Sequence, residues 1–292
     1  MTTLSGKTVL ITGATNGIGK QTALELAKQG ATVVIVGRNS ERTQAVIAEI
    51  KTVTNNPNIE GLIGDLSLIA DVHRLADEFK ARHDRLHILI NNAGGIFFQR
   101  EETSEGHEMT FALNHLSYFL LTNLLLDMLQ ASAPARIINV SSDAHQMGKI
   151  DFEDIELKKA YAAFAAYGRS KLMNIYFTYE LARRLKESGV RGVTVNALHP
   201  GFVRTGFWHN TPNGFIKGVM GVLQRFGLTV EKGAETSVYL ATSPEVEDVS
   251  GKYFEKKKAK PSVKGSYEKD EWARLWTVSA EITGLAVPEM VS

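Results

Sequence analysis

Short apolar runs alternate with longer amphipathic stretches along most of this chain. Each run is rich in β-branched residues, and apolar residues follow one another in it instead of alternating with polar ones. Both faces of each expected strand should therefore be covered, as in a parallel sheet. The runs lie at 7–12, 32–36, 59–63, 86–91, 135–140 and 193–198.

The stretches between these runs carry apolar residues at spacings of three and four, which is typical of helices that pack on a sheet. Gly30 and Gly189 follow two of them, where a left-handed helix cap is expected. A final helix is expected over 267–283, after a short strand candidate at 252–254. The earlier helices are expected within 17–30, 40–51, 69–83, 116–130 and 169–189.

This order of strands and helices predicts an α/β fold, a Rossmann-type doubly wound parallel sheet of about seven strands with right-handed crossovers. No linker, repeat or low-complexity tract divides the sequence, so residues 1–292 should form a single domain. The Gly-rich, aromatic segment 206–230 is a candidate substrate lid, although packing explains Phe207 and Trp208 equally well. The lysine-rich patch 255–265 is expected to be a solvated loop.

Composition narrows the class of protein. A hydrophobic share of 43% and a charged share of 22% are ordinary for a soluble globular chain. The net charge of +1 gives no basic field for nucleic acid or an anionic membrane. Cysteine is absent, which excludes disulfides and fits the cytoplasm. No signal region opens the sequence, and its longest apolar run is too short to cross a bilayer, so no membrane anchor is expected.

The first expected strand turns into the first helix through the Gly-rich sequence TGATNGIG. Glycines permit a tight turn and let the backbone approach a pyrophosphate, which the positive end of the helix attracts. Such a turn alone can be a plain tight loop, but its place between a buried strand and an amphipathic helix favours a nucleotide. The expected cofactor contacts are Gly13, Thr15, Asn16, Gly17, Ile18 and Gly19.

Gly37 and Arg38 end the second expected strand, where an acidic residue often binds the ribose of NAD. Arginine instead offers a forked cation to a 2′-phosphate, so the sequence predicts NADP(H). Alternatively, Arg38 is a surface residue and Glu41 supplies the acid.

Two further segments lie at the ends of expected strands, on the same edge of the expected sheet. Asp65, followed by Leu66, could accept a bond from an adenine amino group or could cap the next helix. The small residues Asn92, Ala93 and Gly94 suit close passage of a ligand, and they equally suit a plain turn.

Tyr167 and Lys171 lie four residues apart and therefore share one helix face. A nearby ammonium favours the phenolate, which lowers the phenol's pKa from its usual ~10 and eases proton exchange with a carbonyl or alcohol. Ser141 and Ser142 end the fifth expected strand, where a hydroxyl could hold the substrate oxygen. Alone, such a pair is commonly a surface feature. Together with the glycine loop and the serines, it indicates an active site.

The segments TGATNGIG, NNAG, NVSS, YGRSK and HPG occur in the order of the short-chain dehydrogenase/reductase family, which the chain resembles over roughly residues 5–255. NHLSYFLLTNLLL, SKLMNIYFTYELARRL and ALHPGFVRT resemble the retinol-dehydrogenase-like branch, which includes the WW-domain-containing oxidoreductase. The resemblance implies an NADP(H)-dependent carbonyl reductase or alcohol dehydrogenase acting on a small to medium apolar molecule. It also implies a homodimer or homotetramer. Alternatives are a retinoid or steroid dehydrogenase and a non-catalytic NADP(H) sensor or scaffold.

The resemblance also implies roles for particular residues. Tyr167 resembles the family's acid/base, Lys171 its ribose-binding partner, and Ser142 matches the catalytic serine better than Ser141 does. Asn114 resembles the asparagine that holds a water for proton relay. The remaining implied cofactor contacts are Asn92, Ala93 and Gly94 on the adenosine side, and Pro200, Gly201, Val203 and Thr205 at the carboxamide.

Some features depart from parts of the family. Ser142 lies 25 residues before Tyr167, farther than in much of the family, and the extra piece also resembles the retinol-dehydrogenase-like branch. The anchor of several animal retinol dehydrogenases is missing, which argues against a membrane-bound retinoid role. None of the eight histidines forms a metal-binding pair with a nearby acid, so no metal site is expected.

Overall fold

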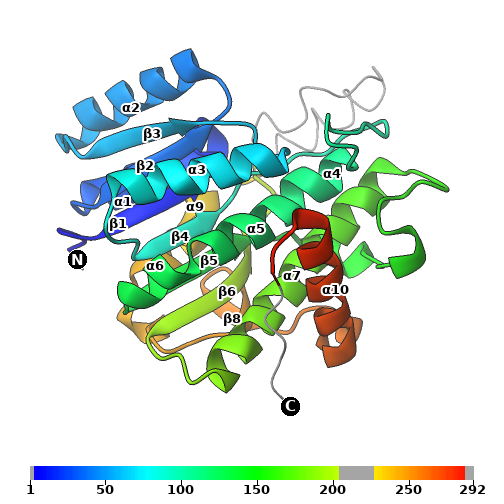
Figure 1. Cartoon of the computed structure of the whole chain (residues 1–292). Coiled ribbons are helices and arrows are strands. Elements are labelled where there is room, and N and C mark those ends of the chain that lie inside the picture. Colours follow the sequence, from blue (N-terminus) through cyan, green and yellow to red (C-terminus); the bar gives the residue numbers. More distant parts are fainter. Residues whose placement is uncertain (1–2, 204–226, 287–292) are drawn as a thin grey trace.

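A single eight-stranded sheet forms the centre of the molecule in the computed structural model, which describes residues 3–203 and 227–286 (Figure 1). The strand order is β3-β2-β1-β4-β5-β6-β7-β8, and every neighbouring pair is parallel except β7 with β8. The predicted doubly wound α/β fold is confirmed. The strands are β1 (Thr8–Thr12), β2 (Thr32–Gly37), β3 (Ile59–Ile63), β4 (Ile88–Asn91), β5 (Ala135–Val140), β6 (Val193–His199), β7 (Lys252–Glu255) and β8 (Lys258–Lys260).

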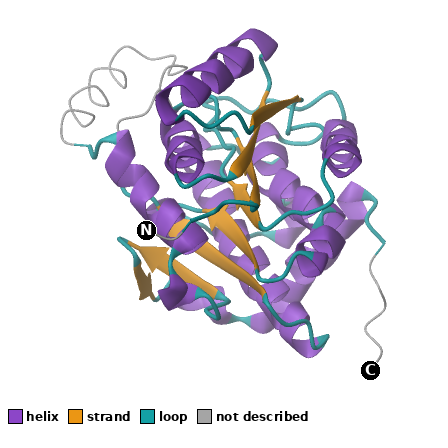
Figure 2. Cartoon of the chain, turned by 90° about the vertical axis from the view of Figure 1, so that its left-hand side faces the viewer, coloured by secondary structure: helices purple, strands orange, loops and turns teal. Residues whose placement is uncertain are grey.

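Helices cover both faces of this sheet (Figure 2). One face carries α1 (Gly17–Lys28), α2 (Ser40–Thr54) and α9 (Val230–Thr242). The other carries α3 (Ile69–Arg82), α5 (Ser117–Leu124), α6 (Leu126–Ala131) and α7 (Ala163–Glu187), and α10 (Lys269–Thr283) packs outside α5 and α7. The short α4 (Met109–Phe111) leads through a π-turn, Ala112–Leu116, into α5.

The strands are buried because both of their faces meet helices. In β1, Val9 and Ile11 pack with α1 and α2, whereas Leu10 packs with α3 and α5 on the opposite side. All three side chains are fully buried. The continuous apolar runs in the sequence therefore reflect a sheet with no solvent-facing side.

The helix caps agree with the sequence, and several helix boundaries do not. Gly30 and Gly189 have φ of +87° and +70°, as expected of left-handed caps. Helix α7 begins at Ala163, before the expected 169, and α2 continues past the expected 51 to Thr54. The helix expected over 116–130 is interrupted at Leu125 (φ −103°, ψ 4°), which separates α5 from α6. The last helix begins at Lys269, because residues 264–267 form a separate 3-10 turn.

The lysine-rich patch forms an eighth strand, where the sequence suggested only a solvated loop. Lys258 to Lys260 pair with β7 through a turn in which Lys256 and Lys257 have positive φ. The side chains of β8 are all exposed, so no burial pattern marked it as a strand. Lysines on such an edge discourage further strand pairing.

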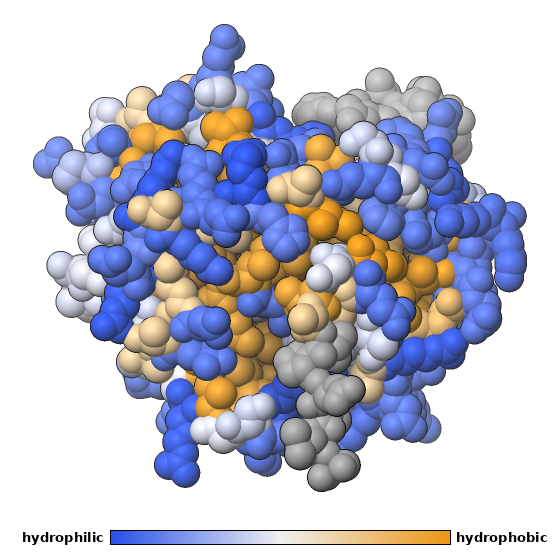
Figure 3. Space-filling model, viewed as in Figure 1, coloured by the Kyte–Doolittle hydropathy of each residue, from blue (hydrophilic) through white to orange (hydrophobic). Residues whose placement is uncertain are grey.

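Apolar side chains gather in the middle of the face of the molecule that carries α5 (Figure 3). The partly buried side chains of Leu113, Leu124, Leu126 and Met128 pack against the main core. No helix of the described segments has both the length and the apolar character to cross a bilayer.

Candidate active site

The turn after β1 is shaped by glycines that have no room for a side chain. Gly13 and Gly17 have φ of +64° and +51°, which only glycine adopts readily. A Cβ on Gly13 would lie 2.7 Å from the Cα of Ala93, and one on Gly19 would lie 2.6 Å from the carbonyl oxygen of Gly13. The backbone is therefore held close against the segment that follows β4.

This segment braces the glycine turn directly. The Thr12 hydroxyl accepts hydrogen bonds from the backbone N–H groups of Asn92 (2.9 Å) and Ala93 (3.0 Å). In return, the Asn92 Nδ2 donates to the carbonyls of Thr12 (2.9 Å) and Gly13 (3.1 Å). The side chain of Asn92 thus builds the turn after β1, whereas the sequence suggested for its segment either close passage of a ligand or a plain turn after β4.

The N-terminus of α1 suits an anion. Asn16 precedes the helix in an extended conformation, and within the described chain no side chain hydrogen-bonds to cap it. The first turn contains no acidic residue. Backbone N–H groups and the helix dipole therefore face the glycine turn without a competing negative charge, and a pyrophosphate fits these donors.

The predicted cofactor-selecting residues lie beside this turn. A Cβ on Gly37 would approach the side chains of Thr15 and Thr43 to 2.5 Å, which explains the glycine at the end of β2. The next residue, Arg38, has a side chain that is 68% exposed, and its guanidinium lies 3.8 Å from the Asp65 carboxylate. The arginine is thus available for a phosphate, and Asp65 is the acid beside it.

Asp65 closes a turn of its own ahead of α3. Its Oδ1 accepts hydrogen bonds from the backbone N–H (3.0 Å) and the hydroxyl (2.7 Å) of Ser67. The residue that precedes α3 is Leu68, so Asp65 does not cap that helix. Its N–H donates to Asp71 at 2.7 Å, which with Arg74 lowers the pKa of Asp71.

Asn114 lies in the π-turn before α5 and is fully buried. Its Oδ1 accepts from the N–H of Gly95 (2.8 Å), and its Nδ2 donates to the Gly95 carbonyl (2.9 Å) and the Ser170 hydroxyl (3.0 Å). Its backbone carbonyl accepts from Asn174 Nδ2 at 2.9 Å. The carboxamide therefore joins the loop after β4 to the helix that carries Tyr167.

Ser142, Tyr167 and Lys171 meet at the carboxyl end of β5. A hydrogen bond links the Ser142 and Tyr167 side chains, and the Lys171 Nζ lies 5.5 Å from the centroid of the Tyr167 ring. Lys171 is buried (3% exposed) and its Nζ donates to the Val140 carbonyl at 3.1 Å. The structure thus brings together the three side chains that the sequence placed on two elements.

The electrostatics of this trio differ from the sequence expectation. Burial raises the pKa of Tyr167 to about 12, which the hydrogen bond from Ser142 only partly offsets. Burial also lowers the pKa of Lys171 to about 7. The lysine lies over the ring face and bonds a carbonyl, so in this structure it does not lower the phenol's pKa as the sequence suggested.

Several residues hold the trio in ways that the sequence did not indicate. Ser141 donates from its hydroxyl to the Lys171 backbone carbonyl at 2.8 Å, which explains why Ser142, and not Ser141, faces Tyr167. Ser170 donates to the Tyr167 carbonyl at 2.8 Å. The buried ring of Tyr118 lies on α5 with its centroid 5.7 Å from the Lys171 Nζ. No motif marks Tyr118, because the contact depends on how α5 crosses α7.

The loop after β6 completes the described part of the site. Gly201 has φ of +89°, and a Cβ there would lie 2.5 Å from a side-chain carbon of Leu228. Val203 is buried, and a Cβ added to Gly233 of α9 would lie 2.6 Å from its side chain. Pro200 is half-buried beside them. Thr205 and positions 206–226 of the predicted lid lie outside the described residues.

Known proteins and a family model are similar to this chain in sequence. The family model for short chain dehydrogenases matches residues 7–214. Retinol dehydrogenase 13 of Homo sapiens is 44% identical over 295 aligned residues, which cover 99% of this chain and 88% of that protein. Retinol dehydrogenase 12 of Mus musculus is 42% identical, over 97% of this chain and 88% of that protein.

Solved structures resemble the fold as well. The NADP active-site complex of Pseudomonas aeruginosa RhlG has a TM-score of 0.68 and 27% identity, covering 86% of this chain and 95% of that one. A short chain dehydrogenase from Burkholderia cenocepacia J2315 in complex with NADP has a TM-score of 0.67 and 26% identity, covering 86% and 96%.

Proposed function

This chain belongs to the short-chain dehydrogenase family, and from that premise we propose that it is an NADP(H)-dependent oxidoreductase. It interconverts a carbonyl and an alcohol on a small to medium apolar substrate. The observation that carries the proposal is the meeting of Ser142, Tyr167 and Lys171 at the sheet edge, beside the glycine turn. A protein that only binds a dinucleotide has no use for a hydroxyl and a phenol at that place.

The proposed chemistry divides between cofactor and protein. A bound nicotinamide supplies or accepts the hydride at the substrate carbon. During reduction, Tyr167 donates its phenolic proton to the carbonyl oxygen, and its raised pKa keeps that proton in place at neutral pH beforehand. The Ser142 hydroxyl, which is already hydrogen-bonded to Tyr167, donates a hydrogen bond to the same oxygen as negative charge develops there. In the oxidation direction, the proton moves from the alcohol to the phenolate.

Lys171 acts on Tyr167 through charge. A pKa of about 7 leaves the cofactor-free amine partly neutral at physiological pH. An anionic dinucleotide favours the charged amine, because an opposite charge raises the pKa of a base. The ammonium then stabilises the phenolate that remains after proton transfer. Asn114 fixes the wall beside Lys171, since a Cβ on Gly94 would lie 3.2 Å from Asn114 Oδ1 and 3.4 Å from Lys171 Nζ.

NADP(H) is the proposed cofactor because Arg38 offers an exposed guanidinium at the end of β2. Two of the similar solved structures are complexes with NADP, which supports the same choice. The residues that would hold it are those of the glycine turn and the loops after β3, β4 and β6. A cytoplasmic location and a homo-oligomeric assembly stay predictions from the sequence.

A retinoid substrate is the second candidate, and the similarity to retinol dehydrogenases 12 and 13 favours it. One experiment tests both. The purified protein is mixed with NADPH and separately with retinal, aliphatic and aromatic aldehydes, ketones, a steroid and quinones, and loss of the reduced nicotinamide is followed. Turnover of apolar carbonyls is expected. If NADPH binds and none of these carbonyl compounds is turned over, the enzyme proposal fails and a sensor role takes its place.

A further inference from the structure

A chain of buried hydrogen bonds links the C-terminal helix α10 to Asn114. The Ser279 hydroxyl lies 2.9 Å from His115 Nε2, and His115 Nδ1 lies 3.4 Å from Asn174 Oδ1. Asn174 then donates from Nδ2 to the backbone carbonyl of Asn114 at 2.9 Å. All four residues are completely buried. The chain joins α10, the π-turn and α7 without involving the sheet.

The partners assign a direction to every bond in this chain. Asn174 donates to a carbonyl, so its oxygen must accept from His115, whose Nδ1 therefore carries the hydrogen. His115 Nε2 must then accept from the Ser279 hydroxyl. Burial lowers the pKa of His115 to about 4, so the ring stays neutral and the direction holds at physiological pH. Aligned bonds in a low-dielectric interior strengthen one another.

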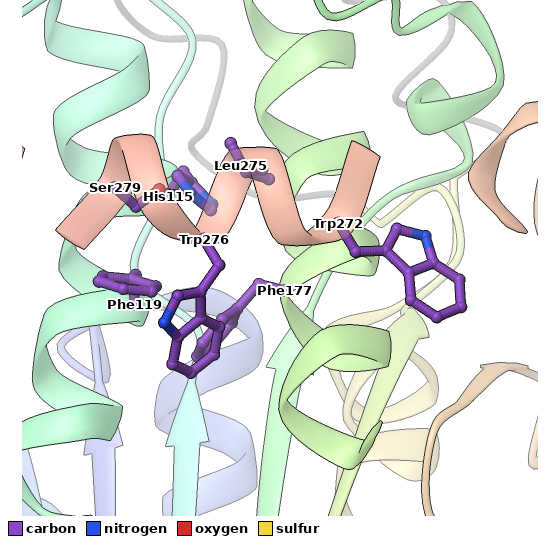
Figure 4. A pocket seen from close by; sticks show the side chains of 7 residues that line it. All are labelled: His115, Phe119, Phe177, Trp272, Leu275, Trp276 and Ser279. Atoms are coloured by element: carbon purple, nitrogen blue, oxygen red, sulfur yellow. Dashed lines mark hydrogen bonds between the residues drawn. The ribbon is translucent and has the colours of Figure 1, made fainter. Parts of the chain in front are cut away.

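Packing alone does not explain these polar groups. Figure 4 shows His115 beside Ser279 of α10, with Phe119, Phe177 and Trp276 next to them. The His115 ring stacks on Phe111 with centroids 5.6 Å apart, and Trp276 meets Phe119 at 5.0 Å. The contact between Trp276 and Phe119 attaches α10 without a hydrogen bond. Burying polar side chains here costs free energy unless each is paired, so an apolar set would have served attachment as well.

At its other end the chain fixes a residue of the active site. The Asn114 carboxamide bonds both the N–H and the carbonyl of Gly95, and it bonds Ser170, which in turn bonds the Tyr167 carbonyl. A shift of the Asn114 backbone would therefore move the loop after β4 and the wall beside Lys171 together.

We propose that Ser279, His115 and Asn174 are positioning residues through which helix α10 sets the place of Asn114. The kinetic part of this inference rests on the proposed function, because the place of Asn114 affects turnover only in an active enzyme. The structural part does not rest on the proposed function, because the hydrogen bonds between the Asn114 carboxamide and the Gly95 backbone exist in the cofactor-free protein.

The test compares Ser279→Ala with Thr283→Val. Thr283 lies one turn later on α10 and is also buried. Among the residues that the structure describes, its hydroxyl donates only to the Ser279 and Ala280 backbone carbonyls of its own helix. In Ser279→Ala, we expect the amide hydrogen of Gly95 and the segment 112–118 to exchange about fivefold faster, as loss of one net hydrogen bond implies. Turnover should fall about tenfold, less than the ~100-fold of a full 1 Å misplacement, with the KM for NADPH unchanged. Thr283→Val should show neither effect.

His115→Phe provides a second variant that keeps the aromatic packing and removes both side-chain hydrogen bonds. Because it removes one hydrogen bond more than Ser279→Ala does, it should speed exchange and lower turnover at least as much. Exchange at Gly95 in both variants equal to that in Thr283→Val would overturn the proposal. If the wild-type protein turns over no substrate, the proposed function fails, and the exchange comparison still decides whether the chain positions Asn114.

Discussion

The buried Lys171 amine should lower the free energy of unfolding of the cofactor-free protein by an amount that depends on pH. Its amine is buried, and burial lowers its pKa from 10.5 to about 7. The unfolded chain therefore binds more protons than the folded one between pH 7 and pH 10.5. The free energy of unfolding then rises with pH across this window, because raising the pH removes the protons that the unfolded state binds in preference to the folded state. Below pH 7 both states carry the charge, and the full penalty remains.

The size of the effect follows from the two pKa values. Linkage gives a penalty of about 4 kcal/mol at pH 7 and about 2 kcal/mol at pH 9. Lys171→Met removes the titrating group and keeps a flexible side chain of similar length. The variant should therefore gain stability over the wild type at pH 7, and its advantage should shrink by about 2 kcal/mol at pH 9. Loss of the hydrogen bond to the Val140 carbonyl offsets part of this gain.

Urea unfolding of the cofactor-free proteins at several pH values between 7 and 9 measures this difference. Other titrating groups cancel when the two proteins are subtracted at each pH. Lys258→Met, on the exposed strand β8, controls for the loss of a lysine charge as such and should not reproduce the change with pH. If the stability difference between Lys171→Met and the wild type stays the same from pH 7 to pH 9, burial does not penalise the charged Lys171 amine. The lowered pKa assigned to Lys171 would then be wrong.

Three further outcomes test the site. Tyr167→Phe should lower turnover by a factor of about 100 or more while NADPH still binds, since general acid–base groups contribute about 10²–10⁴. Steady-state kinetics measures turnover and fluorescence titration measures NADPH binding; turnover close to that of the wild type would remove Tyr167 from the mechanism. Arg38→Asp should reverse the preference in kcat/KM from NADPH to NADH, because the carboxylate repels a 2′-phosphate and accepts from a ribose hydroxyl, and an unchanged preference would place Arg38 outside the cofactor site. Gly19→Ala should abolish cofactor binding, because its Cβ would meet Gly13 O at 2.6 Å; calorimetry with NADPH checks this, and wild-type affinity would argue against the glycine turn as the phosphate site.

Much of the site could be predicted from the sequence, because its residues follow strand ends or share a helix face. Gly13, Ser142 and Pro200 come within two residues of the ends of runs that predict buried strands. In a parallel sheet such positions gather at one edge, and Tyr167 and Lys171 are neighbours on α7 by helix geometry alone. These rules are local, so one sequence is enough to apply them.

The environment of those residues could not be predicted in the same way. The sequence suggested that Lys171 lowers the pKa of Tyr167, whereas burial raises it to about 12 in this structure. The reason is that a pKa depends on how much water the surrounding elements exclude and on where a flexible side chain points, which no spacing records.

The order of strands and helices, the doubly wound fold, the glycine turn and the Tyr–Lys pair were thus determined by the sequence alone, because hydrophobic period and glycine placement act over a few neighbouring residues. Only the tertiary structure decided that Tyr118 lies against Lys171, that Asn92 builds the glycine turn, and that Ser279 reaches Asn114 through His115. Those contacts join residues far apart in the chain, and their geometry depends on how whole helices cross one another.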